Sequence, residues 1–372
     1  MKRVILLIVA MLVCHVYVCP AQQLYPAKDG KYWGFIDLQG HWIIIPRYRS
    51  IGVFSSGRAP VENKSTGLWG YMNRKGHLVI PAKYKHVNDF VDGLAQLKDE
   101  DKNYGMIDTT GAWVIQPEFD RLEIFKDGVA RANKGKWGVI DRKGAWVIQP
   151  QFDALQDFSD GLAAVKENGK WGYVDKQGKW VIQPVYENAE PFHENRARVR
   201  NVVAGKWFII NKKNERIGQG EFKGLEDFQY GVAKASDSWW GLVDSLGQWV
   251  CKDKFDILGD FDEGLARARN GDLWGWVNTK GEWVIKPTFA HNRDFSDGLA
   301  RVKVNGLWGY INKSGAMVIQ PVFEHAWKFT DGYAVVVKGG YGVINTAGEF
   351  VVPPKFKKIR PLEEDPFSVQ RQ

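Results

Sequence analysis

The sequence predicts an all-β fold, a tandem array of about ten three-stranded antiparallel β-meander repeats. An aromatic–glycine pair recurs at intervals of 33 to 36 residues along a chain of 372 residues, which indicates a repeat protein. The chain has 40 glycines, and its apolar residues alternate over short runs, as they do in strands. The pairs are Trp33-Gly34, Trp69-Gly70, Tyr104-Gly105, Trp137-Gly138, Trp171-Gly172, the degenerate Trp207-Phe208, Trp240-Gly241, Trp274-Gly275, Trp308-Gly309 and Tyr341-Gly342.

Each repeat contains three apolar segments that are bounded by turn residues. In one copy, segment A is Gly161–Lys166, segment B is Trp171–Asp175 and segment C is Trp180–Pro184. The junctions between them are short and contain glycine, as β-hairpins require. Segment C ends at a proline, which cannot donate to a ladder and favours a strand end or edge. Helix pairs have a similar repeat length, but a glycine or proline about every ten residues excludes them.

The two ends of the array favour an open β-solenoid over a closed, propeller-like ring. An A-like piece, Tyr25–Lys28, precedes the first aromatic–glycine pair, and another, Phe367–Gln370, follows the last segment C. A ring that closes by sharing strands needs no extra A segment, whereas an open array needs capped ends. A closed ring of ten units stays the alternative. Degenerate copies near residues 207–256 indicate a bend or a specialised face.

Residues 1–21 are predicted to be a signal peptide. Lys2 and Arg3 precede an apolar run, and Ala21 ends a small-residue cleavage site. Cleavage there leaves a single repeat domain, residues 22–372, in which Cys251 is the one cysteine and cannot form a disulfide within the chain. A retained anchor is the alternative, although the run is short for a membrane span. We therefore expect a secreted or periplasmic protein, without stable membrane insertion after cleavage.

The combined motif is K-W-G-x-[IV]-[DN]-x-x-G-x-W-V-I-x-P followed by F-x-D-G-L-A, and it recurs over roughly residues 24–370. It resembles the repeat of the WG, or KWG, family of bacterial proteins. The resemblance implies a β-rich array with a widely varying number of repeats and no established catalytic activity. Together with the predicted signal peptide, it implies a place in the bacterial cell envelope.

The tryptophans have two possible roles. Those in the aromatic–glycine pairs and at the start of segment C recur in register, so we expect them to pack between repeats. The glycine of the pair is expected to permit close approach of a neighbouring ring or backbone. Exposed aromatic platforms for sugar rings are the alternative role, and three tryptophans outside the pattern are the candidates for it: Trp239, Trp276 and Trp327.

Segment A carries a basic ladder. Alternate residues of a strand share a face, so stacked A segments would align their basic residues into a stripe that could bind an anionic glycan. The candidates are Arg131, Arg198, Arg200, Arg267, Arg269, Arg301 and Lys303. The alternative is neutralisation by acids in or near the adjoining turns: Asp92, Asp127, Asp160, Glu194, Glu263, Asp297, Asp331, Asp120, Asp153 and Asp256.

Charge and motif content limit the function classes. A net charge of +8 on an exported chain makes nucleic acid an unexpected partner. No catalytic motif, cofactor-binding motif or convincing metal site is present, and His86, His291 and His325 occupy equivalent loop positions. We therefore expect a non-catalytic exported protein that provides a binding or scaffold surface for a protein or a cell-envelope polysaccharide. The alternatives are a cell-envelope glycan-binding module and an enzyme with a cryptic carboxylate pair.

Overall fold

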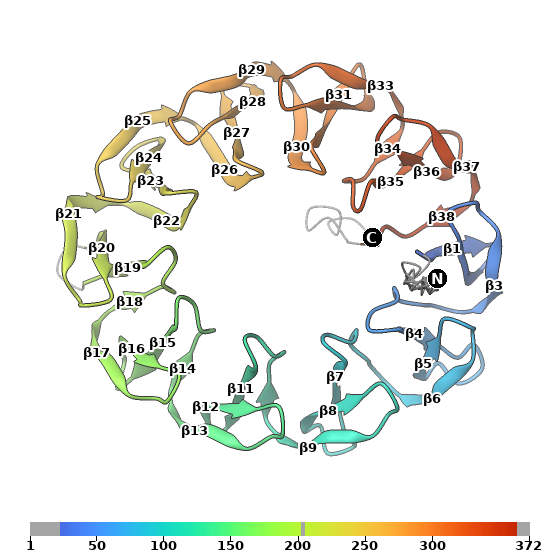
Figure 1. Cartoon of the computed structure of the whole chain (residues 1–372), viewed down its shortest axis with the longest axis horizontal. Helices are drawn as coiled ribbons and strands as arrows, with labels where there is room; N and C mark the ends of the chain where they lie inside the picture. The colour runs from blue at the N-terminus through green and yellow to red at the C-terminus, as the bar shows by residue number, and fades with distance from the viewer. Residues whose placement is uncertain (1–22, 202–204, 363–372) are drawn as a thin grey trace, which may run out of the picture.

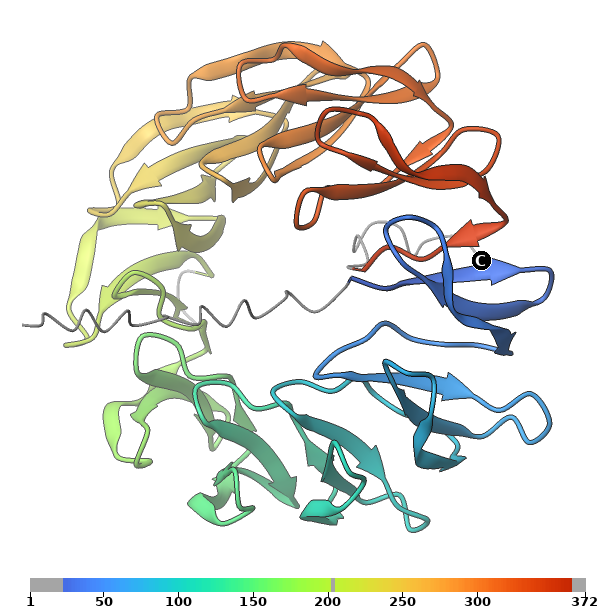
Figure 2. The same cartoon turned by 45° about the vertical axis from the view of Figure 1, so that its right-hand side comes forward.

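The chain folds into a closed ring of β-sheet blades, a β-propeller (Figure 1). A computed structural model describes residues 23–201 and 205–362, and this part of the chain contains 38 strands in ten sheets. In Figure 2 the blue N-terminal strands lie beside the red C-terminal ones, where the ring closes. The prediction of an all-β repeat fold is confirmed. The predicted open solenoid of three-stranded repeats is wrong, and the fold is a ring built mostly from four-stranded blades.

The blades are numbered from the N-terminus. Blade 1 consists of β38 (Lys358–Ile359), β1 (Tyr25–Asp29), β2 (Tyr32–Ile36) and β3 (Trp42–Tyr48). Blade 2 is β4 (Arg58–Glu62), β5 (Trp69–Asn73) and β6 (Leu78–Tyr84), and blade 3 is β7 (Leu94–Lys98), β8 (Tyr104–Asp108) and β9 (Trp113–Phe119). Blade 4 is β10 (Arg121–Leu122), β11 (Val129–Lys134), β12 (Lys136–Asp141) and β13 (Trp146–Phe152). Blade 5 is β14 (Ala154–Leu155), β15 (Leu162–Glu167), β16 (Lys170–Asp175) and β17 (Trp180–Tyr186).

The second half of the ring repeats this arrangement. Blade 6 is β18 (Asn188–Ala189), β19 (Arg196–Arg200), β20 (Trp207–Asn211) and β21 (Arg216–Phe222). Blade 7 is β22 (Gly224–Gln229), β23 (Val232–Ser236), β24 (Trp240–Asp244) and β25 (Trp249–Phe255). Blade 8 is β26 (Ile257–Asp262), β27 (Leu265–Asn270), β28 (Leu273–Val277) and β29 (Trp283–Phe289). Blade 9 is β30 (His291–Ser296), β31 (Leu299–Val304), β32 (Leu307–Asn312) and β33 (Met317–Phe323), and blade 10 is β34 (His325–Ala326), β35 (Tyr333–Val337), β36 (Tyr341–Asn345) and β37 (Phe350–Phe356).

The strand that the sequence analysis missed is the innermost strand of the blade. Segments A, B and C form the next three strands, with segment C at the periphery (Figure 1). In blade 5 the innermost strand is Ala154–Leu155, which pairs with Lys166 and Val165 of segment A. In five blades this strand has only two residues, which is too short for an alternating pattern. Among the described residues, eight sheets have four strands, and blades 2 and 3 have three.

Ring closure uses an innermost strand from the other end of the chain. β38 pairs with β1, so that Ala27 lies opposite Ile359 and Lys28 opposite Lys358. The N–H of Arg360 donates to the Pro26 oxygen at 2.9 Å. The N-terminal A-like piece predicted an open array because it seemed to be a surplus strand. It is instead the second strand of blade 1, and the tenth repeat supplies its inner neighbour.

The hydrophobic core lies between blades. The described residues contain ten buried clusters, and each one draws on two consecutive blades. Tyr173 of blade 5 packs in one cluster with Val199 of blade 6. Val343 of blade 10 shares another with Ile36 of blade 1, so the junction that closes the ring is packed like the others. Because no blade buries its own faces, each depends on both neighbours.

The glycine of the aromatic–glycine pair lies directly under segment C. At nine of these glycines an added Cβ would stand 2.1–2.7 Å from a backbone oxygen of that segment, which confirms the expected close approach. In the sixth repeat Phe208 replaces the glycine, and Gly218 and Gly220 occupy the opposite strand. The Phe208 ring meets Tyr186 of blade 5 edge-on, with centroids 6.1 Å apart. At other junctions the tryptophan that begins segment C makes this edge-on contact, as Trp180 does with Phe152 of the preceding blade.

Two predictions fall outside the described residues: the signal peptide, residues 1–21, and the second A-like piece, Phe367–Gln370. Within residues 23–201 and 205–362, no helix has the length and apolar character that a membrane span needs.

Candidate functional site

The first basic residue of segment A in blades 4, 6, 8 and 9, which we call the inner residue of the ladder, points to the next blade. Arg301 is only 7% exposed, and its Nη1 donates to the Ala326 oxygen at 2.6 Å. Three more arginines donate in the same way: Arg131 to the Leu155 oxygen at 2.7 Å, Arg198 to the Leu225 oxygen at 2.6 Å and Arg267 to the Asn292 oxygen at 3.5 Å. Every acceptor belongs to the innermost strand of the following blade. These side chains therefore link neighbouring blades.

Carboxylates beside these acceptor oxygens form ion pairs with three of the same arginines. Arg131 Nε lies 2.5 Å from Asp157, and Arg198 Nε lies 2.9 Å from Asp227. Arg267 pairs with Asp294. Each of these acids directly precedes a phenylalanine in its repeat, and that dipeptide is the sequence signal that could have identified them.

The acids named in the sequence analysis have another role. Several of them accept backbone N–H groups of the following blade. Glu194 accepts from Gly231 at 2.9 Å, and Asp297 accepts from Gly332 at 2.7 Å. Three ladder arginines, Arg131, Arg198 and Arg267, are thus neutralised by acids before phenylalanine, and Arg200 lies 3.9 Å from Glu187.

Asp157 gives this arrangement a pH dependence. Burial opposes ionisation, but Lys126 and Arg131 outweigh it and hold the pKa of Asp157 below its ordinary value. A carboxyl with a depressed folded-state pKa stabilises the fold above its unfolded pKa, and this contribution is lost as the pH falls through the folded pKa. We expect Asp157→Asn to lower the free energy of unfolding by about 1 kcal/mol at pH 7.

Urea titrations at pH 7 and in acid measure this effect. The difference between Asp157→Asn and the wild type should shrink as the pH falls below about 4, where the unfolded carboxyl takes up its proton. A difference that stays constant from pH 7 into acid would show that Asp157 does not stabilise the fold as a carboxylate.

The outer residues of the ladder lie against tryptophan rings. Each is directly opposite the tryptophan of the aromatic–glycine pair on the neighbouring strand. The cation-to-centroid distances are 5.4 Å for Arg200 and Trp207, 5.7 Å for Arg269 and Trp274 and 5.7 Å for Lys303 and Trp308. Such contacts favour cation–π attraction. In blades 6, 8 and 9, therefore, the inner and the outer basic residue of segment A both make contacts within the ring.

The three off-pattern tryptophans occupy different environments. Trp276 is fully buried, so it has no surface to offer a sugar ring. It lies opposite Arg267 in the sheet, as Tyr310 lies opposite Arg301, which makes it a core residue that the repeat alignment could have placed. Trp239 is 53% exposed at a turn of blade 7. Trp327 is half-buried, with its ring 5.8 Å from that of Tyr341.

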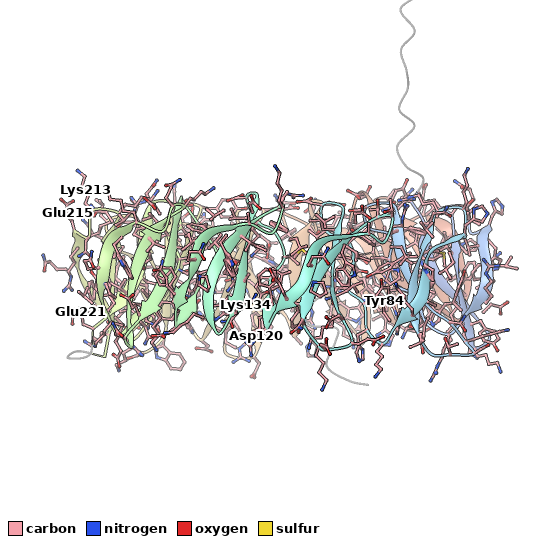
Figure 3. All side chains as sticks on the ribbon, turned by 90° about the horizontal axis from the view of Figure 1, so that it is seen from below. Tyr84, Asp120, Lys134, Lys213, Glu215 and Glu221 are labelled. Carbon is pink, nitrogen blue, oxygen red and sulfur yellow. The ribbon has the colours of Figure 1, made fainter. Side chains whose placement is uncertain are left out.

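A groove of about 1260 Å³ lies between blades 2 and 3. The segment after β6 lines one side, and β7 and the turn that follows it line the other. Tyr84, Tyr104 and Trp113 contribute aromatic rings, and His86 also lines the groove. The described residues contain no group of three side chains that could hold a metal ion. In Figure 3 Tyr84 lies toward the same face of the ring as Asp120 and Lys134, and Lys213 and Glu215 lie on the other.

The groove exists because blade 3 lacks its innermost strand. In blade 4 the N–H of Asp120 donates to the Asn133 oxygen, and the Asp120 carboxylate accepts from the turn at Gly135. The equivalent residue before blade 3 is Lys85, which cannot accept such a bond. In place of a backbone ladder, the Asn88 side chain donates to Gln96 Oε1 at 2.8 Å.

The groove carries cationic side chains without acidic partners. Lys83, Lys85, Lys98 and Lys102 line it, against Asp99 and Glu100. In the described part of the chain none of these lysines forms an ion pair, in contrast to Arg131, Arg198 and Arg267 of the ladder. Lys98 Nζ lies 4.4 Å from the Tyr104 ring centroid. The sequence signals for this site are Lys85, at a place where five other repeats carry an acid, and the longer acidic turn Asp99–Asn103.

Comparisons with known proteins identify the repeat. A family model described as WG containing repeat matches nine segments: 33–65, 69–102, 104–136, 137–171, 171–207, 240–274, 274–308, 308–340 and 341–370. The unmatched residues between 207 and 240 belong to the degenerate sixth repeat. No curated protein matches the chain.

Solved structures add a likeness of fold alone. A crystal structure of a eukaryotic initiation factor is 12% identical with a TM-score of 0.51, covering 82% of this chain and 98% of that one. BamB from Moraxella catarrhalis is 10% identical with a TM-score of 0.35, covering 62% of this chain and 83% of that one, and is too distant to support an argument. With nine matched repeats over most of its length, the chain belongs to the WG-repeat family.

Proposed function

We propose that this protein is a non-catalytic, exported binding scaffold of the bacterial cell envelope, which presents the groove between blades 2 and 3 to a protein partner. The groove itself is the observation that carries the proposal. The repeated arginines, acids and tryptophans contact neighbouring strands and blades, whereas the groove interrupts the repeat. Apolar and aromatic linings with a few polar groups are typical of binding sites.

The lysines of the groove support a role in recognition. They have no acidic partners in the described residues and surround aromatic rings. Unpaired surface cations attract anionic partners and set the specificity of an encounter. The groove therefore suits a partner with acidic groups.

A capture experiment tests the proposal. The full chain is immobilised and exposed to envelope extract from its own organism, as wild type and as the Lys85→Glu/Lys98→Glu variant. The matched control is Lys143→Glu/Lys280→Glu, which makes the same charge change at exposed turns of blades 4 and 8. We expect specific partners to be lost from the groove variant and retained by the control. Identical capture by all three proteins would exclude the groove as the binding surface.

An anionic cell-envelope glycan is the second candidate partner. Tyr84, Tyr104 and Trp113 together with the lysines favour it, because aromatic faces stack on sugar rings and ammonium groups pair with uronate or phosphate groups. Retention on an immobilised anionic polysaccharide, lost in the same groove variant, would support this partner. Equal retention of the groove variant and the control would exclude it.

A further inference from the structure

We infer that the groove accepts an extended acidic peptide segment, which pairs with β7 as the missing innermost strand of blade 3. The inference rests on the proposed binding function and names its chemistry: main-chain hydrogen bonds to β7 combined with carboxylates that meet the groove lysines. Addition of a strand to an exposed sheet edge is a general mode of peptide recognition.

The edge of β7 is open where a strand would pair. β7 is the edge strand of its sheet. The Leu94 N–H and C=O bond to Val91, and the Asp99 N–H bonds to the Asn103 oxygen. Because alternate residues of an antiparallel strand face opposite neighbours, Gln96 and Lys98 direct their main-chain groups away from β8 and into the groove.

Elsewhere in the ring these same positions are paired. The main-chain oxygens of Asn133 and Arg131 in blade 4 accept from the N–H groups of Asp120 and Glu123, which flank the innermost strand β10. In blade 2, which also has three strands, the edge is covered because Gly52 donates to the Pro60 oxygen. Blade 3 alone, among the described blades, has only the Asn88 side chain at this edge, 3.3 Å from the Gln96 oxygen.

The ring itself shows that this edge can take a segment from far away in the sequence. β38 adds to β1 across the closing junction by pairing only two residues and the following N–H of Arg360. The innermost strand of a blade therefore need not be adjacent in sequence to the segment A strand with which it pairs. A partner segment offered to β7 would use the same geometry.

Charge selects which segment binds. Four lysines and two acids line the groove, so that it carries a positive excess at neutral pH. The lysines have no ion-pair partners in the described residues, so an acidic peptide gains attraction without displacing existing pairs. An anionic glycan meets the same lysines but cannot satisfy the N–H and C=O groups of Gln96 and Lys98 in a strand register.

A fluorescence-polarisation titration of the full chain tests the inference. The probe is a labelled peptide of alternating glutamate and valine, capped at both ends. We compare it with the same peptide with N-methylated backbone amides, with an alternating lysine–valine peptide and with a labelled oligogalacturonate. We expect the acidic peptide to bind and the lysine peptide to fail. N-methylation should abolish binding, because it removes the donors to β7.

Variants locate the interaction. Lys85→Glu/Lys98→Glu should weaken binding of the acidic peptide by about tenfold or more, whereas Lys143→Glu/Lys280→Glu should leave it unchanged. Absence of binding, or equal binding of the N-methylated peptide, would overturn strand addition. Binding of oligogalacturonate but not of the peptide would also overturn it and would favour the glycan candidate. If capture from the envelope extract still depends on the groove lysines while the peptide does not bind, the proposed function stands and this inference fails.

Discussion

Truncation after Lys357 is expected to lower the free energy of unfolding by about 3–5 kcal/mol. The truncation removes β38, whose Ile359 side chain is 1% exposed and belongs to the cluster between blades 10 and 1. It also removes Arg360, whose guanidinium donates to the Ile51 oxygen of blade 2 and lies 5.2 Å from the Trp33 ring. Loss of these contacts exposes apolar faces at the one junction that is not covered by chain continuity.

The matched control is a truncation after Leu362, which keeps β38 and Arg360. Guanidinium unfolding of both proteins, followed by tryptophan fluorescence, measures the difference. The control should stay within about 1 kcal/mol of the full chain. Equal stability of the two truncated proteins would show that β38 does not hold the ring closed.

Gly172→Ala is expected to destabilise the protein by about 2–4 kcal/mol. An added Cβ would stand 2.5 Å from the Ile182 oxygen and 2.8 Å from the Pro184 nitrogen. Both are backbone atoms of the paired strand, so relief of the clash requires β16 and β17 to separate. Separation would disturb the packing of Tyr173, whose hydroxyl donates to the Glu190 oxygen of the next blade at 2.7 Å.

Gly259→Ala is the matched control for this substitution. It also lies in a strand, but the nearest atom to an added Cβ is the Arg267 oxygen at 3.5 Å, an ordinary contact. We expect its unfolding midpoint to change little, within about 0.5 kcal/mol. Thermal and denaturant unfolding of both variants give the comparison. Similar losses for both would mean that close approach of segment C is not the reason for the glycine.

The sequence predicted the repeat unit and its local chemistry. The period, segments A, B and C and the close approach of segment C to Gly172 follow from patterns that recur in nearly every copy. A side chain that packs against the neighbouring repeat recurs in every repeat. Its packing role can therefore be predicted from the sequence. Trp276 is the exception, because its identity differs from that of the tyrosines at the same register position and so drew attention as a surface residue.

The sequence could not predict closure. Strands of two residues, such as Ala154–Leu155, leave no periodicity, and their pairing depends on contacts between repeats. Whether the last repeat meets the first is set by the small rotation from blade to blade, which no single copy encodes. The prediction also assigned the ladder arginines to a stripe, because it followed one strand face without the following blade that covers it.

The candidate groove was missed for a related reason. A repeat is recognised from the residues that recur, whereas the groove depends on an innermost strand that blade 3 lacks. Lys85 and the longer turn after Lys98 were visible in the sequence. Their meaning depends on the position of the innermost strand, which lies in the stretch that the sequence pattern presents as a junction between repeats.

Closure of the ten-bladed ring is the central claim, and a cross-link between its two ends tests it most directly. Lys28→Cys/Lys358→Cys, in a background in which Cys14, Cys19 and Cys251 are replaced by alanine, places two thiols opposite each other on β1 and β38. Directly opposed residues of antiparallel strands have Cα atoms about 4.5–5.5 Å apart, within the range that a disulfide spans. Lys28→Cys/Lys179→Cys, with the second thiol in blade 5, is the control.

Under mild oxidation in dilute solution, the closed ring predicts rapid formation of an intramolecular disulfide between positions 28 and 358, identified by peptide mapping, and none between positions 28 and 179. Failure of the first pair to cross-link, or equal cross-linking of both pairs, would contradict the closed ring.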